Sequence, residues 1–223
     1  MNDKLIQAVL EDGEADLKHL LRQDPELLRA RMKGDQLIKI IPHWLYTGDT
    51  ALHLAAAGLK DRAVKLLLKA EADPNAENRR GAIPLHYACD ARPASGGTWN
   101  PGRQAEIIDL LVQGGAGLDH ADRGGATPLH RAVRARSPEA VRKLLDAGAR
   151  ADSRLGKQRS TPIHLAVHYT GAGGTAGAVE EQLQIIRLLL RHGADPAAPD
   201  ATGKSAVAAA RSDRVREALK VST

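Results

Sequence analysis

The sequence predicts an all-α protein, an α-solenoid of stacked helix–turn–helix repeats with β-hairpin-like loops between them. One short segment recurs along the chain, and each copy is followed by a second apolar run and a turn. The composition agrees with this fold: the chain has no Phe and only 2% aromatic residues. A compact β-rich core usually needs more aromatic volume, whereas thin helical layers pack well on Ala and Leu.

The recurring segment gives the repeat its length. Successive copies begin about 33 residues apart, and two of the intervals are longer by about ten residues. Turn-forming stretches rich in Gly, Ala, Asp and Pro close each unit. The copies begin at Thr50, Ile83, Thr127 and Thr161, with a degenerate copy at Ser205, and the turns lie at residues 72–75, 114–116, 147–149 and 192–196.

Each residue of the segment has a physical role at the start of a helix. Thr127, for example, offers its hydroxyl to a free backbone N–H, and Pro128 occupies the first helical position, where its missing donor costs nothing. Leu129 points into the core, and His130 reaches back toward the cap. Because one such unit cannot bury its apolar face alone, neighbouring units must stack.

These residues resemble the ankyrin repeat, which has a Thr-Pro-Leu-His start, a Leu-Leu pair and a Gly-Ala-Asp close. The resemblance, of bacterial type with two loop insertions inside repeats, covers roughly residues 45–212. It implies a single domain with a first capping repeat, an inserted finger, four full repeats and a last capping repeat. Their expected limits are residues 1–32, 33–47, 48–198 and 199–223.

Three insertions depart from the repeat. Residues 31–46 predict an extended, strand-like finger, which either covers the N-terminal edge of the stack or serves as an apolar docking arm. Residues 92–102 and 170–180 interrupt repeats two and four between their helices, and their Gly, Pro, Ser and Thr content predicts loops. Because both loops fall at the same place in their repeats, they are expected to project from the same edge.

The resemblance also implies where a partner binds, because proteins of this kind contact partners through the concave face and the loop tips. The concave positions predict a polar row of Asp90, Arg134 and His168. A basic rim beside that row suits an acidic partner surface. The expected partner-binding residues are Tyr87, Asp90, Trp99, Arg131, Arg134, His168, Tyr169, Arg79, Arg80 and Arg123.

Several kinds of chemistry are disfavoured by the sequence. Histidines about one helix diameter apart cannot share a metal ion, so no metal site is expected. No nucleotide-binding loop or hydrolase motif is present, and no cofactor is expected. Cys89 is the only cysteine, which fits a reducing, cytoplasmic compartment. No signal peptide or membrane span is evident, and nucleic-acid binding is disfavoured because aromatic residues are scarce.

Two functions therefore remain open at this point. The first is a non-catalytic protein–protein interaction module, an adaptor, scaffold or inhibitor that holds its partner on the concave groove and loop tips. The alternative is a small-molecule-binding protein or an unusual enzyme, with a polar cleft under the 92–102 and 170–180 loops. In that cleft an acid, arginines and a histidine would bind a small anionic ligand and move a proton.

Overall fold

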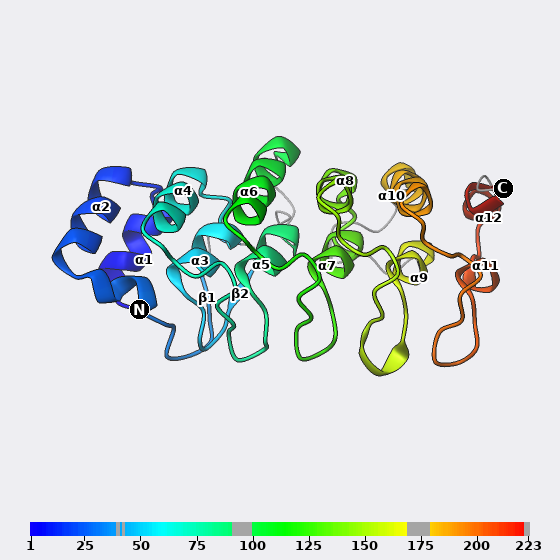
Figure 1. The fold of residues 1–223 in the computed structure, drawn as a ribbon, viewed down its shortest axis with the longest axis horizontal. Helices are drawn as coiled ribbons and strands as arrows, with labels where there is room; N and C mark the ends of the chain where they lie inside the picture. Colours follow the sequence, from blue (N-terminus) through cyan, green and yellow to red (C-terminus); the bar gives the residue numbers. More distant parts are fainter. Residues whose placement is uncertain (39–40, 42, 91–99, 169–178, 221–223) are drawn as a thin grey trace. The chain divides into compact units, whose positions relative to one another are not determined.

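The computed structural model describes residues 1–38, 41, 43–90, 100–168 and 179–220. These residues form two compact units, Met1–Gly117 and Leu118–Thr223. We call them the N-terminal unit and the C-terminal unit, and each is built from antiparallel helix pairs in the predicted solenoid arrangement (Figure 1). The two inserted loops predicted at residues 92–102 and 170–180 fall mostly outside the described residues.

The N-terminal unit contains three helix pairs. The first helices of the pairs contact one another, and so do the second helices, which gives two helical layers (Figure 1). In the sequence, a 3₁₀ helix and a two-stranded ribbon come between the first and second pairs. The elements are α1 (Asp3–Leu10), α2 (Glu14–Gln23), η1 (Pro25–Arg29), β1 (Gln36–Leu37), β2 (Trp44–Leu45), α3 (Ala51–Ala57), α4 (Asp61–Lys69), α5 (Pro84–Asp90) and α6 (Pro101–Gln113).

The C-terminal unit repeats this plan. Within it the α7, α9 and α11 helices form one layer and the α8, α10 and α12 helices form the other (Figure 1). The first two pairs are each followed by a loop, at residues 147–161 and 192–205. The elements are α7 (Pro128–Arg134), α8 (Pro138–Asp146), η2 (Gly156–Gln158), α9 (Pro162–Val167), α10 (Val179–Arg191), α11 (Ala206–Ala209) and α12 (Asp213–Lys220).

The predicted capping role of the signature histidines is confirmed. At α3, Thr50 and His53 form a reciprocal capping box in which His53 Nδ1 accepts the Thr50 backbone N–H at 3.2 Å. His53 Nε2 also lies 3.0 Å from the Ala82 carbonyl oxygen in the next loop. Such a ring must be neutral with its proton on Nε2, because Nδ1 accepts and Nε2 donates. The signature thus caps its own helix and ties it to the following repeat.

The two long insertions occupy equivalent places, as the sequence predicts. Gln104 is buried in the first turns of α6, and its Nε2 donates to the Ala88 carbonyl of α5 at 2.9 Å. Gln182 does the same in α10, donating to the Ala166 carbonyl of α9 at 2.8 Å. Each glutamine therefore joins the two helices that flank the insertion in the sequence, so the helix pair is retained.

Candidate functional site

The inserted finger of the N-terminal unit is an antiparallel ribbon. Arg31 pairs with Thr50 as an isolated bridge, and the Met32 N–H donates to the Asp49 carbonyl at 2.8 Å. Further out, the β1 and β2 strands pair so that Leu37 stands opposite Trp44. The predicted extended form is therefore confirmed, and we call the described part of residues 31–50 the ribbon.

One face of the ribbon packs inward. Leu45 and Ile41 are 0% and 1% exposed, respectively. The His43 ring lies against the Tyr87 ring of α5 with 4.2 Å between their centroids, and His43 Nε2 lies 3.6 Å from Asp90 Oδ2. The expectation that the finger covers the N-terminal edge is therefore wrong in one respect: its contacts reach α5, in the third helix pair.

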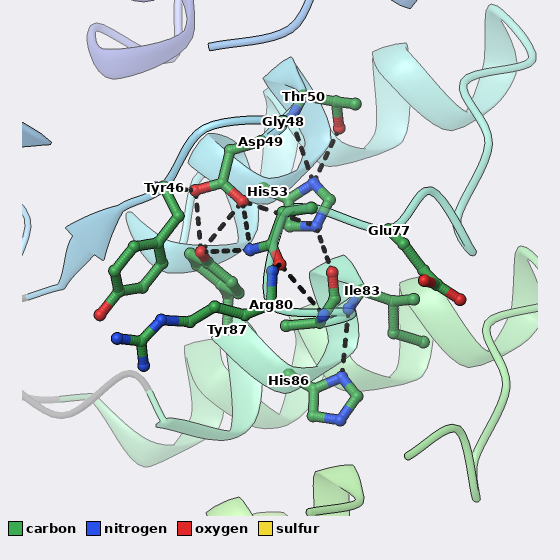
Figure 2. A network of polar contacts seen from close by, with 12 residues as sticks. Tyr46, Gly48, Asp49, Thr50, His53, Glu77, Arg80, Ile83, His86 and Tyr87 are labelled. Carbon is green, nitrogen blue, oxygen red and sulfur yellow. Dashed lines mark hydrogen bonds and ion pairs between the residues drawn. The ribbon is translucent and has the colours of Figure 1, made fainter. Parts of the chain in front are cut away.

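A buried polar network connects the ribbon to the rest of the N-terminal unit (Figure 2). Asp49, which is 0% exposed, is its centre. Its carboxylate accepts the Tyr46 N–H at 2.6 Å, the Asn78 amide at 2.7 Å and the Tyr87 hydroxyl at 2.8 Å. Burial, followed by the nearby Asp49 charge, raises the pKa of Tyr87, so its hydroxyl stays a donor. Three donors satisfy a carboxylate that would otherwise be costly to bury.

The opposite face of the ribbon is exposed and carries aromatic and apolar side chains. Side chains alternate along a strand, so Trp44 faces away from the buried Leu45. Tyr46 follows the strand, and its ring lies 6.4 Å from the His43 ring, between centroids. Leu37 and Trp44, directly opposite each other, are 54% and 51% exposed. The Arg80 guanidinium lies 4.1 Å from the centroid of the Tyr46 ring, a cation–π distance (Figure 2).

Arg79 joins this surface from the same loop as Arg80. Its guanidinium lies 5.6 Å from the Tyr46 centroid and also forms an ion pair with Asp35 of the ribbon. Thr47 donates to the same Asp35 carboxylate, which lowers the pKa of Asp35. We call the set of Leu37, Trp44, Tyr46, Arg79 and Arg80 the hairpin face.

Two of the predicted partner-binding residues of the N-terminal unit are not on the surface. Tyr87 is 2% exposed because the ribbon and the Asp49 network cover it, so its expected surface placement is wrong. The Asp90 side chain is only 10% exposed because it faces His43. Arg79 and Arg80 are exposed at a loop tip, as predicted. Trp99 lies outside the described residues.

The predicted residues of the C-terminal unit are placed differently from one another. Arg131 is mostly buried and forms an ion pair with Asp122 at 2.5 Å, so most of its side chain is not accessible to a partner. Arg123, Arg134 and His168 are exposed. Tyr169 lies outside the described residues. Arg134 and His168 are thus accessible to a partner, and their role in binding stays a prediction.

The sequence did not indicate that His43 and Trp44 take opposite sides of the ribbon. The one signal available was the alternation of Ile41, His43 and Leu45 with Trp44 and Tyr46 after Pro42, which has the period of a half-buried strand. The partners of His43 lie in another repeat, and no local pattern identifies them.

The described residues contain no group of three or more His, Cys, Asp or Glu side chains arranged to hold a metal ion. None of the helices in the described part of the chain combines the length and the apolar character needed to cross a membrane.

This architecture is similar to that of known proteins. A family model for ankyrin repeats (three copies) matches residues 5–95 and 99–200. A crystal structure of an ankyrin repeat domain from Acinetobacter baumannii is similar, with a TM-score of 0.74 and 26% sequence identity. The match covers 98% of this chain and 96% of that one.

Two curated proteins are similar over parts of their length. The B-cell lymphoma 3 protein homolog of Mus musculus is 32% identical over 159 residues, which is 71% of this chain and 32% of that protein. Zygote-specific protein 3 of Chlamydomonas reinhardtii is 38% identical over 100 residues, which is 45% of this chain and 24% of that protein. The matches therefore span a third or less of these two relatives.

Proposed function

The chain belongs to the ankyrin-repeat family, and from this premise we propose that it is a non-catalytic protein-binding module of the adaptor, scaffold or inhibitor type. Ankyrin repeats are in general protein-interaction modules. The proposed contact surface in the N-terminal unit is the hairpin face, and the proposed partner presents an apolar side chain beside acidic ones.

The observation that carries this proposal is the exposed pair of Leu37 and Trp44. Among the described residues, large hydrophobic side chains are exposed at only three positions, and two of them, at 54% and 51%, stand opposite each other on this ribbon. Trp, Tyr and Arg are the residue types that most often dominate binding energy at protein interfaces. The hairpin face combines all three.

The charge of the surface supports an acidic partner. Within the described part of the chain, no carboxylate lies within ion-pair distance of the Arg80 guanidinium, which rests on the Tyr46 ring instead. A carboxylate of a partner can approach Arg80 without displacing an internal ion pair. The buried Asp49 network holds the ribbon in place before binding, so little ordering entropy is lost on docking.

The proposal extends to the rest of the chain. The exposed Arg123, Arg134 and His168, together with Trp99, Tyr169 and Arg131, remain proposed contacts of the same partner. The chain acts in this proposal as one binding domain with capping repeats at residues 1–32 and 199–223, the inserted finger at residues 33–47 and four full repeats at residues 48–198. A cytoplasmic location is part of the proposal, since Cys89 is a buried thiol outside any disulfide.

The alternative, a catalytic or small-molecule cleft under the two long loops, has less support. It requires the Asp90 carboxylate to be available for chemistry, whereas that carboxylate faces His43 and is 10% exposed.

Affinity capture from the native host tests the proposed function. The bait is the full chain, and the captured proteins and metabolites are identified together by mass spectrometry. Trp44→Ala and Arg80→Ala should each lose the protein partner, whereas Val207→Ala, at another exposed apolar residue, should retain it. Undiminished capture by Trp44→Ala, with circular dichroism showing a folded protein, would remove the hairpin face from the account.

A further inference from the structure

A cavity of about 490 Å³ lies at the end of the C-terminal unit, apart from the residues discussed so far except His168. Three alanines at positions 208–210 form one wall, and His168, Lys204, Arg211 and Arg216 complete the lining. Its volume falls within the range of about 300–1,000 Å³ that is usual for small-molecule sites. The cavity thus combines an apolar wall with four basic side chains.

The positive charge of this cavity is only partly balanced. In the described part of the chain, neither the Lys204 ammonium nor the Arg211 guanidinium has a carboxylate within ion-pair distance. Arg216 is compensated, because it pairs with Asp213 at 2.5 Å and also donates from Nε to the Ala210 carbonyl at 3.1 Å. Two cationic groups therefore remain available in the cavity.

Asp200, a carboxylate whose charge acts on the His168 ring, is already engaged. Asp200 accepts the Thr202 N–H at 2.7 Å and the Lys204 N–H at 3.1 Å, which holds the loop that presents Lys204. The Thr202 hydroxyl also donates to Asp200 at 2.7 Å, and this bond, followed by the two backbone bonds, lowers the pKa of Asp200. Asp200 thus shapes the loop instead of neutralising the Lys204 side chain.

A fifth basic residue, which does not line the cavity, holds the backbone next to it. The Arg136 guanidinium donates to the Ala166 carbonyl at 2.8 Å and to the His168 carbonyl, so it fixes the backbone that carries the His168 ring. Burial, then the charge of Arg211, lowers the pKa of His168. The negative charge of Asp200 acts in the opposite direction. Lys204, Arg211 and Arg216 line the same cavity as His168, and such a group of basic side chains favours an anion.

We propose that this cavity binds a small phosphomonoester, with Lys204 and Arg211 holding the phosphoryl group and the 208–210 alanines contacting the organic part. A phosphomonoester carries a charge near −2 at neutral pH, which matches the two uncompensated cations. Arginine binds phosphoryl oxygens with two parallel hydrogen bonds, and lysine adds a compact point charge. A carboxylate, with one negative charge, matches this cavity less well. The site lies in the C-terminal unit and does not depend on the hairpin face.

Isothermal titration of the full chain with phenyl phosphate tests the proposal. We expect saturable one-to-one binding that falls by about tenfold or more in Arg211→Ala and in Lys204→Ala, because each loses a charge-assisted contact. Arg214→Ala is the matched control, since Arg214 is an exposed arginine three residues along that pairs with Glu180 and does not line the cavity. This control should bind as the unaltered protein does.

Two further titrants identify the ligand chemistry. Benzoate should bind at least about tenfold more weakly than phenyl phosphate, and inorganic phosphate should also bind more weakly. The proposal is overturned if phenyl phosphate shows no saturable binding, or if Arg211→Ala, with an unchanged melting temperature, binds it undiminished. Benzoate binding as tightly as phenyl phosphate would contradict the phosphoryl group, and equal binding of inorganic phosphate would contradict the organic ester.

Discussion

His43 Nε2 lies 3.6 Å from Asp90 Oδ2, and this contact joins the inserted ribbon to the α5 helix of another repeat. Both side chains are about nine-tenths buried, at 11% and 10% exposure. The His43 ring also packs on Tyr87 at 4.2 Å between centroids. His43 therefore helps to hold the hairpin face in position, although its own side chain is mostly buried.

Replacing this histidine should loosen the ribbon. His43→Ala removes a ring contact with Tyr87 and the polar contact with Asp90, and we expect it to destabilise the protein by about 1–2 kcal/mol. Amide hydrogen exchange in β1 and β2 should accelerate, whereas exchange in α1 should not change. In a double-mutant cycle with Asp90→Asn, the two substitutions should be less than additive. Fully additive effects would mean that the two side chains do not interact.

The Tyr87 hydroxyl should contribute more to the free energy of unfolding than an average tyrosine hydroxyl does. Tyr87→Phe removes a donor from the buried Asp49 carboxylate and leaves the Asn78 amide with one acceptor fewer. We expect a loss of about 1–3 kcal/mol in urea unfolding monitored by circular dichroism. Tyr46→Phe serves as the control, because the interaction of Tyr46 with Arg80 uses the ring face. Equal stability of the two variants would contradict the network.

Acid should destabilise the C-terminal unit through His130. Burial lowers the pKa of His130 to about 4, from 6.5 as the ordinary value. A buried histidine that must be neutral binds fewer protons in the folded state, so its contribution is fully present above pH 6.5 and is lost as the pH falls toward 4. The loss amounts to about 3 kcal/mol.

Urea unfolding between pH 7.5 and pH 4.5, monitored by circular dichroism, checks this pH dependence. His130→Gln should flatten the decline in stability by the amount that His130 contributes. His19→Gln, which alters an exposed histidine, controls for the substitution itself. If His130→Gln and the unaltered protein lost stability in parallel, the assigned role of His130 would be wrong.

Two glycines of the C-terminal unit should respond differently to alanine. Gly148 has a φ of +100° and open space where the Cβ of an alanine would lie, so Gly148→Ala should cost about 1 kcal/mol from backbone strain alone. At Gly125, with a φ of +81°, an alanine Cβ would lie 2.3 Å from the Gly156 nitrogen of the next loop. Gly125→Ala should therefore lose clearly more, about 2 kcal/mol or above, in thermal melts. Equal losses would contradict the close approach of the two loops.

The helix pairs could be predicted from the sequence because their causes are local. Thr127 caps, Pro128 begins the helix and His130 closes the capping box, all within four consecutive residues. The same segment in each repeat fixed the repeat length and placed both long insertions between the helices of a pair. The capping role of the signature histidines is predicted by the same pattern.

The candidate site could be predicted only in part, because its contacts are not local. On a bare helix pair Tyr87 and Asp90 would face solvent, which is where the repeat pattern predicts them. The ribbon folds back and covers both through His43, which is more than forty residues away in the sequence. Arg79 and Arg80 were placed correctly because a loop tip stays exposed whatever packs beside it.

Photo-cross-linking from the hairpin face tests the central claim most directly. A photoreactive amino acid with an aromatic ring, which keeps a large ring at position 44, replaces Trp44 in one variant and Val207 in another, and each purified protein is irradiated with the captured partner. We expect a cross-linked product from position 44, in which the partner is attached beside acidic residues, and none from position 207. A partner that cross-links from position 207 but not from position 44 would contradict the account.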